Sequence, residues 1–392
     1  MKIMQIHNEY KYFGGEDTVL ENEKIILVKN GHEVTQIIRN NNNEIKNIWD
    51  QLIISRNLIH SKKSEKIIND KINLIKPDIV HIHNFFPLWT TSILDACLKN
   101  RVPVVMTLHN YRLLCAKASL YRNGKICELC PQKGLHHALY YGCYQNSFIK
   151  TLPVVNLLFN IKKKKLWLKI DKLIALTKFG KKKFIEFGIP ENKLTVKPNF
   201  IDESKQVKNF NPIKEEFVLY IGRLTKEKGI ETLLKAWEKI DYKLKIFGDG
   251  PLKEKIKKII NKNKKIELNE SVPNIEISKK MSQAKFLIFP SGWYEGFSMV
   301  LLEAFSNKLP VLSSDIGSMK EIITDKKNGI LFKTNNVEDL IEKINFMINN
   351  PNLLNTIKEK AYDRYLDLYA PQKNYEMLIK IYKETIENYN LK

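Results

Sequence analysis

Residues 285–315, KFLIFPSGWYEGFSMVLLEAFSNKLPVLSSD, indicate most clearly which fold the chain adopts. The run Phe286–Pro290 is short and apolar, which is typical of a strand buried in a parallel sheet. A loop follows over Ser291–Gly296, a helical stretch runs from about Phe297 to Asn307, and Pro310–Ser313 resumes as a strand. A strand, a loop, a helix and a second strand in this order predict one unit of a parallel α/β sheet.

Two carboxylates in this unit stand in an E-x7-E arrangement. Glu295 lies in the loop before the helix, and Glu303 lies on the helix among apolar neighbours. A carboxylate in apolar surroundings is costly unless another group pairs with it or donates a hydrogen bond to it. We therefore interpret the two glutamates as a ligand-facing pair; the alternative for Glu303 is a surface position on an ordinary amphipathic helix.

The same alternation of short apolar runs and helical stretches continues along the chain, which at 392 residues is long enough for two domains. Strands that alternate with helices predict parallel sheets. The expected strands of the first half are Lys2–His7, a segment within Gly31–Ile38, Pro77–His83, Pro103–Leu108, Lys172–Leu176 and Leu194–Pro198, and the second half opens with Glu216–Gly222, Lys243–Phe247 and Lys265–Leu268.

The domain boundary is predicted in the polar segment Asp202–Lys214, which contains Pro212. We expect a first domain over residues 1–208, with a cysteine-rich insertion at 111–144, and a second domain over residues 209–371. A hinge is predicted near Asn209–Glu215, and the last helix, within residues 372–392, is expected to return to the first domain.

The chain is strongly basic, with 65 Lys and Arg against 43 Asp and Glu and a net charge of +22. Such an excess fits nucleic acid, an anionic membrane surface or a phosphorylated substrate. Arg is scarce, and no aromatic and Arg cluster is evident, so nucleic acid is the least favoured partner. The basic stretches Lys162–Lys165 and Lys181–Lys183 are either solvated faces or contacts to anionic lipid.

The start of the sequence and the length of its apolar runs indicate where in the cell the protein is expected. The start, MKIMQIHNEY, resembles a strand and has no signal-peptide pattern, and no apolar run reaches the length that spans a bilayer. The sequence therefore predicts a cytoplasmic protein that is either free or peripheral on the inner face of the cell membrane.

The segment VLYIGRLTKEKG, residues 218–229, predicts a phosphate-binding site. Arg223 follows a buried strand, at the end of the strand where ligands bind in open α/β sheets. Lys228 precedes the next helix, whose N-terminus also attracts anions. The alternative for Lys228, in a Lys-rich protein, is a solvated loop charge.

Taken together, several segments resemble the retaining family 4 glycosyltransferases, which have the GT-B fold: two Rossmann-like doubly wound parallel-sheet domains that face each other across a cleft. The resemblance covers nearly the whole chain in the right order. The segments that carry it are Gly14-Gly15, IGRLTKEKG, KPNFID with Asn199 and Asp202, GDGP at 248–251, and EGFSMVLLEA.

The resemblance implies roles for particular residues. Arg223 and Lys228 would hold the donor diphosphate, Glu303 would accept hydrogen bonds from the ribose, and Glu295 would contact the donor sugar. His109, at the end of a strand, is similar to the family's histidine near the anomeric carbon, so His109 and Glu295 are the implied catalytic residues. The full donor-binding set is Gly14, Gly15, Arg223, Lys228, Gly248, Gly250, Glu295, Gly296, Phe297, Ser298 and Glu303.

The implied reaction moves a sugar from a UDP- or GDP-sugar to a saccharide or lipid-linked acceptor, as in the assembly of bacterial surface polysaccharides. No Asp-x-Asp motif is present, so no metal cofactor is expected in catalysis. The alternatives are a sugar-nucleotide epimerase or hydrolase of the same fold and, less favoured, a basic nucleic-acid-binding protein. A dinucleotide-dependent dehydrogenase is disfavoured because no G-x-G-x-x-G follows the first strand.

Three histidines at strand ends are candidates for the same site. His81 and His83 are two residues apart on a strand and share one face, and His83 is nearer its C-terminal end. His83 is therefore the better candidate of the two. The alternative for His109 is a buried structural histidine.

Cys115, Cys127, Cys130 and Cys143 form a C-x11-C-x2-C-x12-C pattern, with His136 and His137 nearby. In a cytosolic protein this spacing indicates a structural zinc site with four cysteine ligands, or with one histidine in place of a cysteine. Disulfides are not expected there. The alternative is a group of unligated thiols, and Cys97 is interpreted as a core residue.

Overall fold

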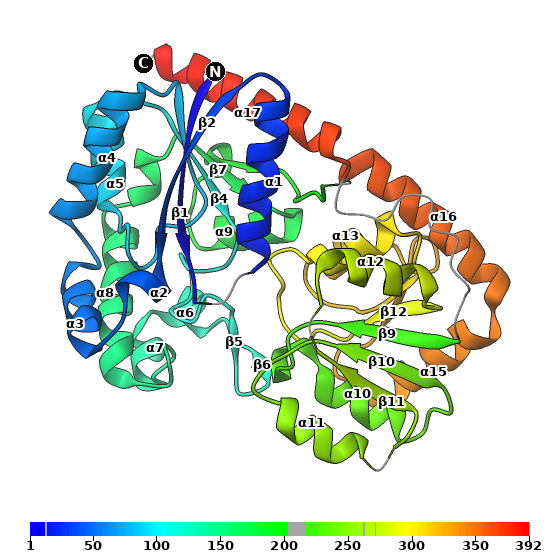
Figure 1. The fold of residues 1–392 in the computed structure, drawn as a ribbon. Helices are drawn as coiled ribbons and strands as arrows, with labels where there is room; N and C mark the ends of the chain where they lie inside the picture. The colour runs from blue at the N-terminus through cyan, green and yellow to red at the C-terminus, as the bar shows by residue number, and fades with distance from the viewer. Residues whose placement is uncertain (12–13, 203–215, 262, 271, 392) are drawn as a thin grey trace. The chain divides into compact units, whose positions relative to one another are not determined.

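The computed structural model describes residues 1–11, 14–202, 216–261, 263–270 and 272–391 (Figure 1). The chain divides into two compact units. The first unit comprises Met1–Leu120, Cys127–Asn199 and Gln372–Lys392, and the second comprises Tyr121–Ile126 and Phe200–Pro371. The predicted hinge and the predicted boundary at 208/209 lie outside the described residues. No helix among the described residues is both long and apolar enough to cross a membrane.

The first unit is built on a six-stranded parallel sheet in the order β2-β1-β3-β4-β7-β8. Its strand order reverses direction between β1 and β3, which is where ligands bind in doubly wound sheets. The strands are β1 (Lys2–Glu9), β2 (Glu33–Asn40), β3 (Ile79–Ile82), β4 (Val104–Leu108), β7 (Lys172–Ala175) and β8 (Leu194–Val196).

Helices cover this sheet and fill most of the connections between its strands (Figure 1). They are α1 (Gly15–Lys29), α2 (Asn41–Glu44), α3 (Ile48–Asn57), α4 (Lys62–Ile75), α5 (Ser92–Lys99), α8 (Phe148–Lys163) and α9 (Lys178–Glu186). The 111–144 insertion adds α6 (Leu129–Lys133), α7 (His136–Tyr140) and the antiparallel hairpin of β5 (Tyr121–Arg122) and β6 (Lys125–Ile126), whose residues group with the second unit.

The last helix, α17 (Pro371–Asn390), packs on the first sheet. Leu378, Ile381 and Tyr382 are buried in one hydrophobic cluster with residues of β1 and β3, including Ile3 and Ile79. The polar end of Tyr382 is satisfied as well, because its hydroxyl lies 2.7 Å from Nδ1 of His81. The C-terminal segment is therefore an integral part of the first unit.

The second unit contains another six-stranded parallel sheet, in the order β11-β10-β9-β12-β13-β14. Apolar clusters lie on both faces of this sheet, which explains the continuous apolar runs of its strands. The strands are β9 (Phe217–Ile221), β10 (Lys243–Phe247), β11 (Ile266–Asn269), β12 (Phe286–Phe289), β13 (Val311–Ser314) and β14 (Ile330–Phe332).

The helices of the second unit connect these strands and end in a long pair, α15 and α16. They are α10 (Ile230–Trp237), α11 (Lys253–Ile260), α12 (Asn274–Gln283), α13 (Met299–Ser306), α14 (Met319–Ile322), α15 (Val337–Asn349) and α16 (Pro351–Leu368). The fold class predicted from the sequence, two doubly wound parallel sheets, is confirmed.

Candidate functional site

The strand order of the second sheet reverses between β9 and β12, so the loops that follow these two strands lie side by side. Gly229 brings them into contact. It has a φ of +72°, and a Cβ there would lie 1.8 Å from the carbonyl oxygen of Pro290. The backbone amide of Gly292 also donates to the carbonyl of Glu227 at 2.8 Å. This close approach places Lys228 next to Glu295.

Glu295 is buried and held by three donors on one carboxylate oxygen. Oε1 lies 2.7 Å from Nζ of Lys228, 2.7 Å from Oγ of Ser291 and 2.7 Å from Nε1 of Trp293. Its backbone carbonyl accepts a further hydrogen bond from Ser318 at 2.9 Å. The carboxylate is therefore fixed in position, and its charge is compensated by Lys228.

Sequence reasoning predicted Glu295 and Lys228 as separate contacts and missed their ion pair. It also missed Ser291, Trp293 and Ser318 as partners. Ser291 and Trp293 are in the loop that carries Glu295, so proximity in sequence was a usable signal for them. Ser318 lies 23 residues away, and only the fold brings it to the site.

Glu303, on α13, has no such partner. It is half-buried beside Leu302 and Ala304, which are fully buried, and its carboxylate makes no ion pair or hydrogen bond with another described residue. Burial raises the pKa of this carboxyl to about 7. An unpaired carboxyl in this position is suited to accept hydrogen bonds from a ligand that brings its own donors.

The remaining predicted residues of this unit fall into two groups. Arg223 is exposed at the end of β9, while Gly296, Phe297 and Ser298 lead into the first turn of α13, with Ser298 buried. Phe297 contacts Tyr369 edge to face, with ring centroids 5.8 Å apart. These residues line the ends of β9 and β12 together with Lys228 and Glu295.

Gly248 and Gly250 have a packing reason of their own. A Cβ at Gly248 would lie 2.0 Å from the carbonyl oxygen of Gly222, and one at Gly250 would lie 2.7 Å from that of Leu224. The loop after β10 therefore packs backbone against backbone on the loop after β9. This accounts for both glycines without a ligand, and their contact with the donor remains a prediction.

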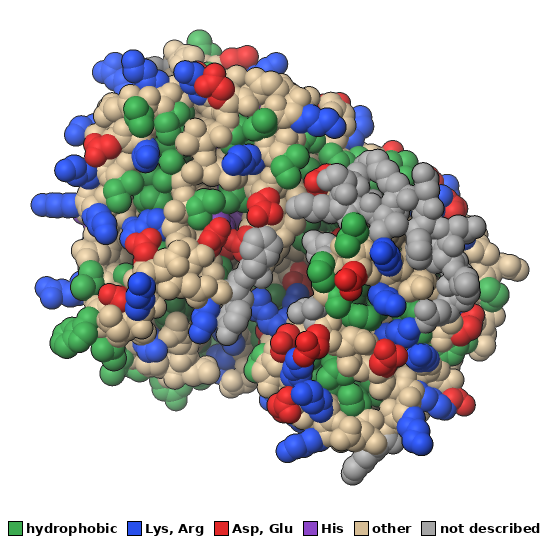
Figure 2. All heavy atoms as spheres, viewed as in Figure 1, with side chains coloured by type: hydrophobic (Ala, Val, Ile, Leu, Met, Phe, Trp, Pro, Cys, Tyr) green, Lys and Arg blue, Asp and Glu red, His purple; other side chains and the backbone are tan. Residues whose placement is uncertain are grey.

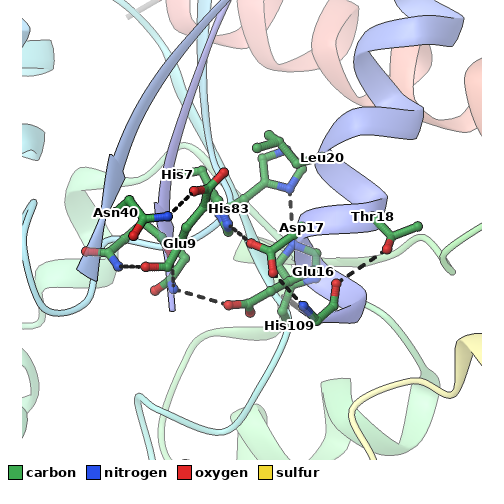
Figure 3. A network of polar contacts seen from close by, with 12 residues as sticks. His7, Glu9, Glu16, Asp17, Thr18, Leu20, Asn40, His83 and His109 are labelled. Atoms are coloured by element: carbon green, nitrogen blue, oxygen red, sulfur yellow. Dashed lines mark hydrogen bonds and ion pairs between the residues drawn. The ribbon is translucent and has the colours of Figure 1, made fainter. Parts of the chain in front are cut away.

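A second polar cluster lies in the first unit, at the C-terminal ends of β1, β3 and β4. Figure 3 shows His83 and His109 beside the start of α1, with His7 and Asp17 next to them. Asp17 accepts from the backbone amide of Gly14 at 2.7 Å and lies 2.7 Å from Nε2 of His7. It thus fixes the start of α1, where Gly14 is the N-cap and Gly15 is the first residue, against β1.

His109 is half-buried, and its Nε2 lies 3.1 Å from Nδ1 of the buried His83. The structure therefore brings His83 and His109 together. His81 turns instead into the core, where Nε2 meets Oγ1 of Thr107 at 2.8 Å and Nδ1 meets Tyr382. The preference for His83 over His81 as a site residue agrees with this arrangement.

Sequence reasoning missed the acidic and basic residues beside His109. Glu16, in the first turn of α1, accepts from Asn84 at 3.2 Å, and its pKa is raised to about 8, mainly by burial and also by the charge of Asp17. The Arg112 guanidinium lies over the ring of Phe86, 4.3 Å from its centroid. No sequence motif indicated Glu16, because its raised pKa arises only from the residues that surround it in the fold.

The four cysteines of the insertion lie near one another. The thiol of Cys130 is within electrostatic reach of the thiols of Cys115, Cys127 and Cys143, and it accepts a hydrogen bond from the backbone of Ala138. Among the described residues, however, the one group of three metal-ligand side chains whose donor atoms all lie within 4.8 Å of one another is Glu23, His81 and His83. The structure thus brings the four cysteines together, and a zinc ion among them stays a prediction.

Comparisons with known proteins agree with this description. The family model described as Glycosyl transferases group 1 matches residues 201–364, and the model described as Glycosyltransferase Family 4 matches residues 13–205. An uncharacterised glycosyltransferase of Methanocaldococcus jannaschii is 30% identical over 98% of each chain. A poly(ribitol-phosphate) alpha-N-acetylglucosaminyltransferase of Staphylococcus aureus is 28% identical over 55% of this chain and 44% of its own.

Solved structures share the fold over its whole length. Sucrose-phosphate synthase of Thermosynechococcus elongatus aligns with a TM-score of 0.72 at 15% identity and covers 99% of both chains. HepE of Anabaena in complex with UDP-glucose aligns with a TM-score of 0.67 at 16% identity, over 98% of this chain and 100% of its own. At these identities the likeness concerns the fold.

The raised pKa of Glu303 predicts a gain in stability when its charge is removed. A folded-state pKa of about 7, above the ordinary 4.5, means that the folded chain binds this proton more tightly than the unfolded chain. The ionised carboxyl therefore destabilises the fold fully above pH 7, and the effect vanishes towards pH 4.5. Glu303→Gln should raise the thermal midpoint at pH 8 by ~2–4 °C, and by nothing measurable near pH 4.5.

Glu276→Gln, at an exposed position on the neighbouring helix α12, is the matched control and should leave the midpoint unchanged at both pH values. An equal shift for Glu303→Gln at pH 8 and pH 4.5 would show that burial does not perturb Glu303 as described.

Proposed function

Because the chain belongs to the family 4 glycosyltransferases, the glycosyl transferases of group 1, we propose that it transfers a sugar from a nucleotide-sugar donor to a saccharide acceptor with retention of configuration. The observation that carries the proposal is the ion pair of Lys228 and Glu295 at the switch point of the second sheet, followed in the chain by the unpaired Glu303 on α13. Solved structures of HepE with UDP and with UDP-glucose support a nucleotide sugar as the donor.

The charges of this cluster suit a nucleoside diphosphate. Lys228 uses one of its three ammonium protons on Glu295, which leaves two for phosphate oxygens. Arg223 is exposed beside it, and none of the described residues pairs with its guanidinium. Breaking the sugar–phosphate bond places negative charge on the leaving diphosphate, and two fixed cations stabilise that charge.

The two glutamates would contact neutral parts of the donor. Glu303 would accept hydrogen bonds from the ribose hydroxyls, which favours its ionised form on binding. Glu295, held by three donors, would accept from hydroxyls of the transferred sugar. In a retaining transfer the acceptor hydroxyl attacks from the same face that the phosphate leaves. The leaving phosphate helps to take the proton of that hydroxyl. By the family resemblance, His109 would contact the sugar near the anomeric carbon.

The acceptor is proposed to be a glycan carried at the membrane, because the first unit has an apolar and basic surface suited to anionic lipid. The helices α3 and α7 both pack against α8. Together they expose Ile48, Trp49, Leu52, Ile53, Tyr140, Phe148, Ile149, Leu152 and Phe159, and we call this set the aromatic face. Figure 2 shows exposed apolar side chains among basic ones where Figure 1 draws α3 and α7.

Lysines border the aromatic face. Lys150 and Lys162–Lys165 on and after α8 are exposed, whereas Lys181 and Lys183 pair with Glu191 and Glu128. Apolar and aromatic side chains flanked by exposed cations are what binding to an anionic bilayer requires. The relative from Staphylococcus aureus, named as acting on poly(ribitol-phosphate), supports a role in surface-polymer assembly.

The cysteine cluster is proposed to hold a structural zinc ion. Cys127 and Cys130 flank the start of α6, and Cys143 donates its backbone amide to Ala138, whose own backbone hydrogen-bonds the sulfur of Cys130. Burial and the neighbouring thiols raise the pKa of Cys130 to about 12, and the hydrogen bond from Ala138 only partly opposes this, so the charge of a bound zinc ion would be what stabilises the thiolate. A bound ion would draw the four thiols into tetrahedral geometry and fix the insertion.

The donor site predicts which lysine matters for turnover. With UDP-, GDP- and ADP-sugars offered in turn, the wild-type protein should release the nucleotide from one of them, slowly without acceptor. Lys228→Met should reduce kcat by ~100-fold or more, because one charged group on the developing phosphate charge is lost. Lys226→Met, at an exposed lysine two residues away, should release nucleotide as the wild type does. No release and no nucleotide binding across the panel would contradict the donor site.

The aromatic face predicts binding to anionic vesicles. The protein should sediment with phosphatidylglycerol vesicles and much less with phosphatidylcholine. Trp49→Glu, at a residue 71% exposed, should weaken binding about tenfold. Leu74→Glu is the control, because Leu74 is 77% exposed on α4 and outside the aromatic face. Equal loss in both variants would count against this surface.

The zinc proposal predicts about one metal ion per chain after purification in zinc-containing buffer, measured by elemental analysis. Cys130→Ser should remove most of it. Cys97→Ser, which alters a buried cysteine of α5, should retain it. A wild-type protein without zinc would contradict the site.

A further inference from the structure

His109 is the surface end of a polar chain that runs into the core of the first unit. Its Nε2 lies 3.1 Å from Nδ1 of His83. The other ring nitrogen of His83, Nε2, lies 3.3 Å from Oε2 of Glu23. Oε1 of Glu23 in turn lies 2.9 Å from the ammonium group of Lys197. Four residues thus form one line: two that directly follow β4 and β3, one on α1, and one that directly follows β8.

The inner members of this line are sealed from water. Glu23 and Lys197 are 0% and 1% exposed, and His83 is 2% exposed. Nε2 of His83 and Oε2 of Glu23 are both without a hydrogen-bond partner among the described residues, although they lie 3.3 Å apart. Oε2 also lies 3.5 Å from Nδ1 of His81, but that nitrogen is engaged with Tyr382. A buried donor or acceptor without a partner is costly, so we infer that His83 and Glu23 complete a hydrogen bond with a small shift of their side chains.

The charges along the line are set by its surroundings. Burial pushes the pKa of Glu23 upward, but the charge of Lys197 and the contact with His83 outweigh it, so the pKa lies well below its ordinary value. Burial lowers the pKa of His83, and burial with the neighbouring His83 lowers that of His109. Glu23 is therefore ionised, and both imidazoles are neutral at pH 7.

A neutral imidazole carries one proton, so one of its nitrogens donates and the other accepts. The direction of one hydrogen bond therefore decides the direction of the next. Glu23 can only accept, which places the proton of His83 on Nε2. Nδ1 of His83 then has a lone pair and must accept from Nε2–H of His109. The lone pair of His109 is left on Nδ1, the ring nitrogen that has no partner among the described residues.

We propose that Glu23 and His83 are positioning residues that lock His109 in the Nε2–H tautomer, so that its Nδ1 accepts a hydrogen bond from a hydroxyl of the bound sugar. The second part of this statement rests on the proposed function, because it needs a sugar beside His109. The first part is independent of any ligand.

Donor atoms of Glu23, His81 and His83 lie within 4.8 Å of one another, a spacing that would also suit a metal ion. Two observations favour the hydrogen-bonded chain. The ammonium group of Lys197 already neutralises Glu23 and would repel a cation. Both nitrogens of His81 are engaged, one with Thr107 and the other with Tyr382.

Glu23→Gln should reverse the direction of the hydrogen bonds along this line. Gln has nearly the size of Glu, but its amide group can donate as well as accept. The ammonium group of Lys197 only donates, so it holds the oxygen of the new amide and turns the NH2 group toward His83. Nε2 of His83 must then accept, Nδ1 becomes the donor, and His109 is left with its proton on Nδ1. The matched control is Glu65→Gln, which alters a surface carboxylate 3.4 Å from His60.

The experiment is long-range ¹H–¹⁵N NMR of protein labelled with ¹⁵N-histidine, with His109 assigned from a His109→Asn sample. We expect a protonated Nε2 and a bare Nδ1 at His109 in the wild type and in Glu65→Gln, and the reverse in Glu23→Gln. In the donor assay, Glu23→Gln should lower kcat by ~10–100-fold with KM little changed, by analogy with residues that orient metal-binding histidines.

Each outcome decides one part of the proposal. A wild-type His109 protonated on Nδ1 would overturn it, and this measurement stands even if Glu23→Gln does not fold. An unchanged tautomer in folded Glu23→Gln would overturn the role of Glu23. A reversed tautomer with unchanged kcat would overturn the positioning role in catalysis. Tautomers as expected, in a wild type that turns over no donor, would support the lock and count against the proposed function.

Discussion

Burial of both faces of each sheet is the constraint on which the rest of this structure depends. Helices cover the parallel strands, so most strand residues are apolar on both sides, as in β12, where all four are buried. Polar chemistry is then confined to the loops at the strand ends, and the order of strands decides which loops meet. In the second unit the loops after β9 and β12 meet, and Gly229 allows the backbone approach that joins Lys228 to Glu295.

The buried ion pair of Glu23 and Lys197 is the exception to this rule. Two charges without access to water are costly, and their attraction repays the cost only when hydrogen bonds complete the geometry. Here His83 completes it on one side, and His81, Thr107 and Tyr382 form a second layer behind. We interpret the pair as fixing the orientation of His109. Apolar residues in its place would make the fold more stable but would leave His109 without this support.

Most of the fold was predictable from the sequence, because the spacing of apolar residues indicates which residues are buried. Buried runs in turn mark the strands and helices of a covered sheet. β10 was predicted to the residue, and β14 was missed because Ile330–Phe332 is too short to show a period. Lys228 and Glu295 were singled out through their family resemblance, and their role in binding a donor stays a prediction. Glu16 and Glu23 were not, since each is one acidic residue on α1 and its properties arise from neighbours that are distant in sequence.

The hydrogen bond between His81 and Tyr382 joins residues 301 positions apart in the chain. A ribosome makes the protein from the N-terminus, so β1, β3 and β4 emerge long before α17, which completes their hydrophobic cluster. During that interval the first sheet has one apolar surface without its native cover, while Phe200–Pro371, the main segment of the second unit, is synthesised and can fold. Synthesis order and folding order therefore diverge: the part of the chain made first is the part that finishes last.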